Sequence, residues 1–228
     1  MKKYCIVNGD DFGASHGINR GIIEAHLKGI LTSTSLMVNM PGAEEAARLS
    51  HEAPLMSIGL HITLTSEEGA PLIDFDSPEM CRAELNRQWD HFIDLLKRLP
   101  THLDSHHNIH RDLRLKPLFM EKAERQNVFL REHSQIRYFS EFYGQWDGET
   151  HPEQISVENL CRMLQTDINE GFTELSCHPG YVDSDYLTSY SLERETELKT
   201  ICSPFVRQTL NELGIELISY QDLIAPVR

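Results

Sequence analysis

The chain of 228 residues is long enough for one large domain or two small ones, and 40% hydrophobic with 25% charged residues is typical of a globular protein, not of a disordered one. Lys and Arg total 21 whereas Asp and Glu total 35, so the formal net charge at pH 7 is −14. Such an acidic surface repels phosphate backbones and anionic lipid headgroups, which argues against nucleic acid or a membrane surface as a partner.

The sequence also argues against a secreted or membrane-bound protein. No apolar run approaches the roughly 20 residues of a membrane span. The apolar stretch behind Lys2 and Lys3 ends at Val7, which is too short for a signal peptide. The cysteines are scattered and never form a Cys-x-x-Cys pair, which favours reduced thiols over disulfides or a zinc ribbon. We therefore expect a cytoplasmic protein.

Short apolar runs alternate with longer amphipathic patterns along the chain. The short runs predict strands at residues 4–8, 34–38, 57–60, 101–104, 128–131, 136–139, 173–177 and 215–219. The longer patterns predict a first helix capped by Ser15 and stopped at Gly29. Further helices are predicted from Gly42 to about His51 and at residues 79–99, 115–126, 155–169 and 193–213, the last broken at Pro204. Residues 66–78 and 141–152 are predicted as loops.

This alternation predicts an α/β fold in which helices cover a parallel sheet. Seven or eight strands favour a TIM-like (βα) barrel, regular or irregular, over an open doubly wound sheet. The chain shows no repeat, low-complexity tract or linker, so we expect one domain over residues 1–228.

Acidic and imidazole side chains lie at the ends of four predicted strands. In a parallel barrel these positions share one rim, where such enzymes place their chemistry. A carboxylate with two imidazoles is a suitable ligand set for a divalent cation and leaves positions open for water and substrate. His102, inside the fourth strand, is expected to be structural. The residues of the rim are Asp10 and Asp11 after the first strand, His61 after the third, His106, His107 and His110 after the fourth, and His178 after residues 173–177.

The spacing of these residues leaves several assignments open. Successive residues of an extended segment point to opposite sides, so Asp10 and Asp11 are expected to differ in role, one binding a metal and the other acting as a base. His106 and His110 have the spacing of two ligands on one helical turn, and Asp104 can orient a ligand imidazole. Each residue also has a structural alternative, such as a helix-entry cluster for the two aspartates.

Five segments, spread from the first strand to the region near residue 180, stand out together. They are Asn8–Gly13, Gly29–Ser35, Gly59–His61, Thr101–His107 and Cys177–Pro179. In this order they resemble the motifs of the YdjC-like carbohydrate deacetylases. The resemblance implies a TIM-like barrel with one divalent metal ion, Mg or Zn. It also implies removal of acetyl groups from N-acetylated sugars, notably chitooligosaccharides such as diacetylchitobiose or its 6-phosphate. Gly9 stands where the family usually has Ala, and Asn108 where it usually has a third histidine.

The resemblance further implies roles for individual residues. Asp11, His61 and His106 match the family's metal ligands, Asp10 matches the position of the catalytic base, and His178 stands where the family has a candidate acid. On this basis we expect Asp10 to take a proton from the attacking water. We expect His178 to stabilise the tetrahedral intermediate or protonate the departing amine.

Aromatic residues with polar tips suit the faces and edges of sugar rings, and four of them lie in loops near the predicted rim. They are Tyr143, Trp146, Tyr181 and Tyr186, for which a plain loop-surface position is an equally good interpretation. Arg131, at the end of the fifth strand, can hold either a carboxylate such as Asp10 or a phosphate on the sugar.

Two other functions stay open at this point. A metal-dependent phosphoesterase would favour a second metal ion and more carboxylate ligands, and a non-catalytic sugar- or metal-binding module would keep the pocket without turnover. Two imidazoles and a carboxylate suit zinc, whereas magnesium prefers oxygen ligands. The expected partner is a small N-acetylated oligosaccharide, and a homodimer is the default assembly.

Overall fold

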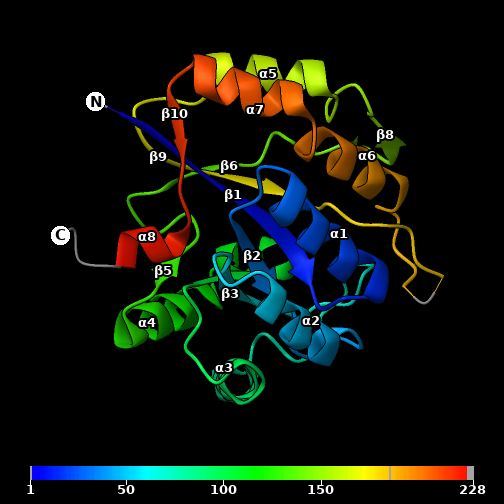
Figure 1. Cartoon of the computed structure of the whole chain (residues 1–228). Helices are drawn as coiled ribbons and strands as arrows, with labels where there is room; N and C mark the ends of the chain where they lie inside the picture. Colours follow the sequence, from blue (N-terminus) through cyan, green and yellow to red (C-terminus); the bar gives the residue numbers. More distant parts are fainter. Residues whose placement is uncertain (1, 185, 225–228) are drawn as a thin grey trace.

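A computed structural model describes residues 2–184 and 186–224, and parallel strands form its centre (Figure 1). The strands of the main sheet are β1 (Lys3–Phe12), β2 (Ser33–Leu36), β3 (Ser57–Ile62), β4 (His102–Ser105), β5 (Phe129–Leu130), β6 (Arg137–Phe139), β9 (Gly171–Cys177) and β10 (Ile215–Leu217). Their order is β5-β4-β3-β2-β1-β9-β6, and β10 pairs with the first residues of β1. Each of these ladders is parallel.

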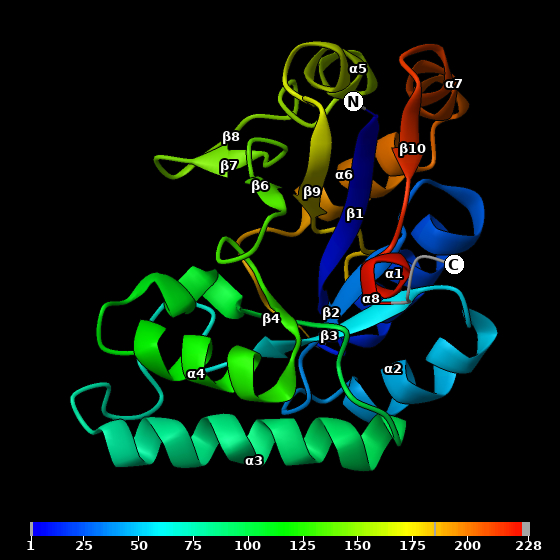
Figure 2. The same ribbon diagram turned by 90° about the vertical axis from the view of Figure 1, so that its left-hand side faces the viewer.

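Helices pack around the outside of this sheet, and Figure 2 shows α3 running along one side of the molecule while α5 and α7 lie at the other. The helices are α1 (His16–Lys28), α2 (Ala43–Leu49), α3 (Pro78–Leu96), α4 (Lys116–Gln126), α5 (Val157–Thr166), α6 (Leu192–Ile201), α7 (Pro204–Glu212) and α8 (Tyr220–Ile224), with short 3-10 turns η1 (Ser50–Glu52) and η2 (His106–Arg111). In the described ranges, no helix has both the length and the apolar character needed to cross a bilayer.

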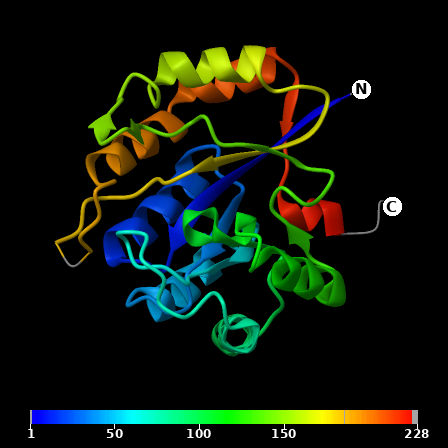
Figure 3. The same cartoon turned by 180° about the vertical axis from the view of Figure 1, so that it is seen from behind.

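The sheet curls into an open barrel. Its two end strands are β5 and β6, and among the described residues no ladder joins them. Figure 3, from behind, shows β6 running beside β9, its single partner in the sheet order. The prediction of an α/β fold with a TIM-like barrel is therefore confirmed, in the irregular form that lacks closure.

Local sequence signals account for most elements. The Ser15 side chain accepts a hydrogen bond from the Ile18 amide and caps α1, as predicted, and Gly29 follows its last residue. The prediction of a loop at 141–152 is wrong in part, because β7 (Gln145–Trp146) and β8 (Glu149–Thr150) form an antiparallel hairpin. Its turn is Asp147-Gly148, both with positive φ, and an Asp-Gly pair is a strong local signal for a hairpin. The short helix α8 was also not predicted.

The two faces of the curled sheet differ in polarity. The main apolar core lies on the side that carries Cys5 and Val7 of β1 together with the helices. The alternate residue Asn8 points to the barrel interior, where its amide donates to Asp10 and to Ser35 of β2. The Ser35 hydroxyl in turn donates to Asp104 of β4. A connected polar network thus fills the barrel beneath the rim and gives the rim side chains a fixed support.

Candidate metal centre and active site

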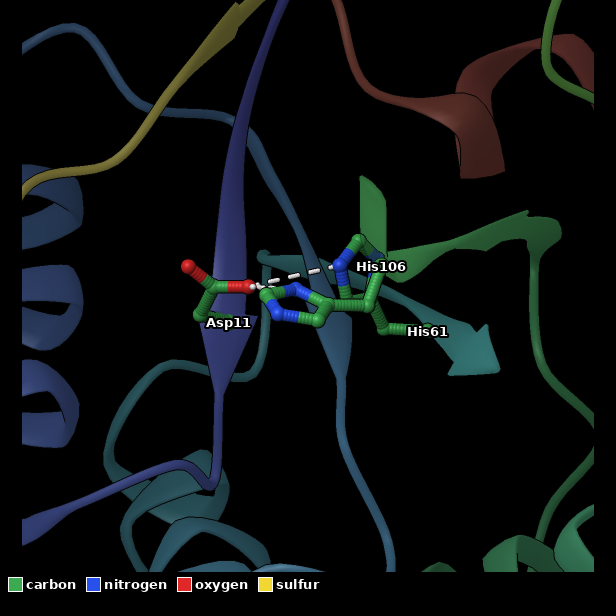
Figure 4. Close-up of side chains that lie close together, drawn as sticks. All are labelled: Asp11, His61 and His106. Atoms are coloured by element: carbon green, nitrogen blue, oxygen red, sulfur yellow. Dashed lines mark hydrogen bonds and ion pairs between the residues drawn. The ribbon is translucent and has the colours of Figure 1, made fainter. Parts of the chain in front are cut away.

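Three side chains converge at the rim, two from the strands β1 and β3 and one from the turn η2 directly after β4. The Asp11 Oδ1 atom lies 3.3 Å from His61 Nε2 and 3.2 Å from His106 Nδ1. All three side chains are buried, and they offer donor atoms within 4.8 Å of one another. Figure 4 shows both imidazoles turned toward the same carboxylate oxygen. One carboxylate and two imidazoles at this separation fit a divalent transition metal ion.

The backbone of β1 has to bend to present Asp11 in this way. Asp11 has a φ of 68°, and the register between β1 and β2 shifts between Gly9 and Phe12, so β1 carries a bulge at this point. The predicted alternation of Asp10 and Asp11 to opposite sides therefore does not hold, because both aspartates line the same cavity. The two carboxylates nevertheless have different partners.

Asp104 orients the His61 ring from the side opposite Asp11. The Nδ1–H of His61 donates to Asp104 Oδ1 at 2.8 Å, which leaves Nε2 facing Asp11. Hydrogen bonding of the far ring nitrogen to a carboxylate is the common support of a histidine metal ligand. Burial alone would lower the pKa of His61, but Asp104, Asp11 and Asp10 raise it to about 10.

His106 is held by acids on both sides. Its Nδ1 lies by Asp11, and its Nε2 lies 3.3 Å from Glu67 Oε1 without hydrogen-bond geometry. Burial alone would lower the pKa of His106, but the carboxylates of Asp11 and Glu67 raise it to about 9. The site thus favours positive charge, as expected of a cation-binding site.

The charge balance around the two buried arginines points the same way. Arg131 contacts Asp10, Asp104 and Glu174, and Arg194 contacts Asp11. Four carboxylates against two guanidinium groups leave two negative charges, which the protonated imidazoles of His61 and His106 balance while no metal is bound. A divalent cation that displaces these two protons keeps the charge balance, so the donor set and the electrostatics of the site both fit such an ion.

A second group of donor atoms, from Asp10, His61 and Asp104, is already filled by the protein. The Arg131 Nη2 atom lies 2.8 Å from Asp10 Oδ1 and 2.8 Å from Asp104 Oδ2. A guanidinium in this place excludes a second metal ion from the space between the two carboxylates.

Asp10 is a buried carboxylate at the wall of the cavity. Arg131 grips it with two hydrogen bonds of 2.8 Å, and Asn8 donates to Oδ1 at the same distance. Burial alone would raise the pKa of Asp10, but the charge and hydrogen bonds of Arg131 lower it. The carboxylate is therefore ionised at neutral pH. Its Oδ2 accepts only from Arg131 Nη1 among the described groups and keeps a lone pair for another donor.

His178 lies directly after β9 and lines the same cavity. Its backbone N–H donates to the Glu197 carboxylate, and its Nδ1 lies 3.9 Å from Glu197 Oε1. The rings of Tyr143 and Tyr190 meet the imidazole edge-on at 5.5 and 5.4 Å between centroids. These contacts hold His178 facing the same cavity as the candidate metal ligands.

The cavity has a volume of about 340 Å³ and combines hydroxyl groups with aromatic rings. Tyr143 and Tyr190 stack with centroids 4.5 Å apart on its wall. Its hydroxyl-bearing lining also includes Tyr138, Ser140, Ser176, Thr188 and Ser189. Aromatic faces and hydroxyl groups are complementary to a sugar ring.

Comparison with known proteins identifies the family. The family model of the YdjC-like protein matches residues 4–212 of this chain. The chain belongs to the YdjC-like family. It is 35% identical to a carbohydrate deacetylase of Geobacillus stearothermophilus, over 97% of this chain and 98% of that protein. It is 32% identical to a chitooligosaccharide deacetylase of Proteus mirabilis, over 98% and 100% of the two chains. The family assignment made from the five motif segments is thereby confirmed.

Solved structures support the fold. An Enterococcus faecalis V583 protein named for cellobiose-phosphate cleavage superposes with a TM-score of 0.84 at 27% identity, covering 98% of this chain and 99% of that one. A family 4 carbohydrate esterase from Streptomyces lividans, in complex with acetate, has a TM-score of 0.59 at 14% identity, covering 95% and 91%. The second likeness concerns the fold alone.

The residues expected from the YdjC-like motifs converge, and some of those chosen by position alone do not. Asp10, Asp11, His61, His106 and His178 all line one cavity. This is the convergence that the motifs of the family require, and their chemical roles remain predictions.

His110 does not join this set. It is fully buried and contacts Ser105 and Glu132. The expected pairing of His106 and His110 on one helical turn is wrong, because His107 and Asn108 adopt positive φ and break the turn.

Arg131 and two of the aromatic residues also lie away from the cavity lining. Arg131 holds Asp10, one of its two predicted alternatives. Its guanidinium is fully buried among three carboxylates, which does not suit a sugar phosphate. Tyr181 donates to Glu24 on α1, and Trp146 stacks on His151 in the β7–β8 hairpin. Of the four predicted aromatics, Tyr143 alone lines the cavity as described.

Several residues of the site were not predicted. Arg194 and Glu197 lie on α6, where they read as ordinary charges of an amphipathic helix, and Glu67 lies in a polar loop. The sequence does not distinguish a buried charged residue from an exposed one, so this single chain carries no local signal that these three residues belong to the site. Tyr190 had a weak signal, because aromatics next to a predicted rim suit sugars.

Proposed function

We propose that this YdjC-like protein is a metal-dependent deacetylase of N-acetylated sugars, with chitooligosaccharides such as diacetylchitobiose as substrates. The observation that carries the proposal is the cluster of Asp11, His61 and His106 on a cavity that also has Asp10 and His178 on its walls. The names of the relatives from Geobacillus stearothermophilus and Proteus mirabilis support the substrate class. The volume and lining of the cavity support one sugar unit with its acetamido group inside.

Asp11, His61 and His106 would hold the ion. A divalent cation bound there lowers the pKa of water and polarises a carbonyl oxygen. Two imidazoles with one carboxylate suit zinc better than magnesium, and the metal content of the purified protein decides between them.

The remaining steps fall to side chains of this chain. Asp10 is ionised and has a lone pair on Oδ2, so it accepts a proton from the water whose oxygen attacks the acetyl carbon. Arg131 and Asn8 keep this carboxylate in one orientation. His178, which lines the same cavity, donates a proton to the amine nitrogen as the bond between this nitrogen and the acetyl carbon breaks. The products are acetate and a free amine on the sugar.

Release of acetate from diacetylchitobiose tests the proposal. The protein loaded with Zn²⁺ or Mg²⁺ is expected to release acetate, and chelation of the metal is expected to stop it. Asp10→Asn is expected to lower kcat by about 10²–10⁴-fold, the usual contribution of a general base, while leaving metal content unchanged. Asp94→Asn on the exposed side of α3 serves as the matched control with unchanged activity.

Three outcomes would contradict the proposal. Phosphate release from a sugar phosphate without acetate release favours a phosphoesterase, although the Arg131 guanidinium in the second donor group argues against a two-metal site. Tight sugar binding without turnover favours a binding module. Loss of metal from Asp10→Asn means that the roles of the two aspartates are exchanged.

A further inference from the structure

Arg194 is a buried arginine whose guanidinium contacts a candidate metal ligand. It lies in the first turn of α6 and is 3% exposed. Its Nη2 donates to Asp11 Oδ2 at 2.6 Å, and its Nε donates to the carbonyl of Tyr190 at 2.9 Å. The guanidinium is therefore fixed at two of its nitrogens and cannot move away from Asp11 without breaking both bonds.

Because of this contact, the two carboxylate oxygens of Asp11 have different partners. Oδ1 faces the ring nitrogens of His61 and His106, whereas Oδ2 is held by Arg194. Figure 4 shows the same division, with one oxygen of Asp11 toward the imidazoles and the other pointing away from them. As long as Arg194 holds Oδ2, Asp11 can offer an ion one oxygen and not two.

The number of oxygens that Asp11 offers matters for catalysis. A catalytic site needs coordination positions that the protein does not fill, because water and substrate have to occupy them. A carboxylate that swings to bind through both oxygens takes one of these positions. In addition, a fixed positive charge beside a ligand repels the cation and weakens its binding.

We propose that Arg194 is a positioning residue that restricts Asp11 to one-oxygen coordination, so that a position stays open for substrate while metal affinity is lowered. The inference rests on the proposed metal-dependent function and deepens it. Arg194 also links this ligand to the segment after β9, because its backbone carbonyl accepts a hydrogen bond from the Gly180 N–H, two residues after His178. The same helix thus positions Asp11 and the segment that carries His178.

Manganese titration of the full chain tests the inference. After removal of metal, Mn²⁺ affinity is measured by calorimetry for the wild type, Arg194→Gln and Arg194→Lys. Arg87→Gln, which removes an exposed arginine paired with Glu84 on α3, is the control. Arg194→Gln is expected to bind Mn²⁺ about ten-fold more tightly, since the repulsion is gone and both oxygens of Asp11 are free. Arg194→Lys keeps the charge and is expected to restore an affinity close to that of the wild type.

Catalysis is expected to change in the opposite sense. Arg194→Gln should have a lower kcat on diacetylchitobiose with little change in KM. The second oxygen of Asp11 would occupy the open coordination position, whereas the sugar subsite would be unchanged. A merely structural role for Arg194 predicts weaker metal binding instead. Unchanged or weaker Mn²⁺ binding by a folded Arg194→Gln therefore overturns the inference.

A crystal structure of the wild type with Mn²⁺ decides the matter even if Arg194→Gln does not fold. One Asp11 oxygen on the ion supports the inference, and two oxygens on the ion overturn it. Failure of the wild type to bind Mn²⁺, Zn²⁺ or Mg²⁺ at all refutes the proposed function. Metal binding with no gain in Arg194→Gln refutes the inference alone.

Discussion

Replacement of Arg131 by methionine tests the polar network inside the barrel. The guanidinium is fully buried and makes four hydrogen bonds to Asp10 and Glu174, of 2.6 to 2.9 Å, besides its contact with Asp104. Arg131→Met keeps much of the side-chain volume but leaves three buried carboxylates without their counter-charge. We expect the free energy of unfolding to fall by about 3–5 kcal/mol, the usual result of removing one partner of a buried ion pair.

Urea denaturation at pH 7, followed by circular dichroism on the metal-free protein, measures this loss. Arg87→Met is the matched control, because its pair with Glu84 is half-exposed on α3 and is expected to contribute at most about 1 kcal/mol. The total stability of a natural domain is only about 5–15 kcal/mol, so Arg131→Met is expected to be close to the limit of folding at room temperature.

A double-mutant cycle with Glu174→Gln isolates the direct interaction. Burial raises the pKa of Glu174 despite the opposing effect of Arg131, so loss of its charge should be tolerated better than loss of the arginine. The double variant is expected to be at least about 1 kcal/mol more stable than the sum of the single losses indicates. A loss below about 1 kcal/mol in Arg131→Met, or strict additivity in the cycle, would refute the view that this network supports the rim.

Three further predictions concern packing, acid stability and substrate charge. Alanine in place of a helical glycine normally stabilises by about 0.5–1 kcal/mol, but in Gly21→Ala the new Cβ would lie 2.4 Å from the Gly180 Cα, so thermal denaturation should show lower stability. An unchanged or higher Tm would contradict the contact between α1 and the segment after β9. Burial lowers the pKa of His102 to about 4, so the unfolded chain takes up a proton that the folded chain refuses. The neutral His102 therefore contributes roughly 3 kcal/mol at most to the free energy of unfolding above pH 6.5, and this contribution is lost as the pH falls toward 4. Urea titrations at several pH values should show that the free energy of unfolding falls more steeply with decreasing pH in the wild type than in His102→Gln. Equal pH dependence in the two proteins would contradict this role of His102. Among the described residues that line the cavity, Arg194 is the one arginine or lysine, and it is engaged by Asp11. Diacetylchitobiose 6-phosphate should thus have a kcat/KM about ten-fold lower than diacetylchitobiose, whereas a higher value would place an unrecognised phosphate site nearby.

Local patterns in the amino-acid sequence were sufficient for much of the fold. The alternation of apolar runs with amphipathic segments predicted the parallel sheet, and the cap at Ser15 predicted the start of α1. These features depend on residues within a few positions of one another, which is why one sequence reveals them. The signal for the hairpin of β7 and β8 is local as well, since it lies in the Asp147-Gly148 turn itself.

The position of the candidate site followed from topology and motifs together. A parallel sheet brings the ends of its strands to one rim, so Asp11, His61 and His106 could be expected to meet although they are distant in the chain. The sequence could not separate His106 from His110, because the outcome depends on the left-handed backbone of His107 and Asn108. That conformation turns one histidine into the cavity and the other toward Glu132.

The sequence by itself determined the family, the α/β pattern and the residue types available to hold a metal ion. Only the tertiary structure decided which charges are buried together, that no ladder joins β5 and β6 among the described residues, and that Arg194 reaches Asp11 across 183 positions of the chain. The physical reason is that the pKa and the role of an ionisable group depend on its burial and its neighbours in space. Neither is encoded by the letters immediately around it.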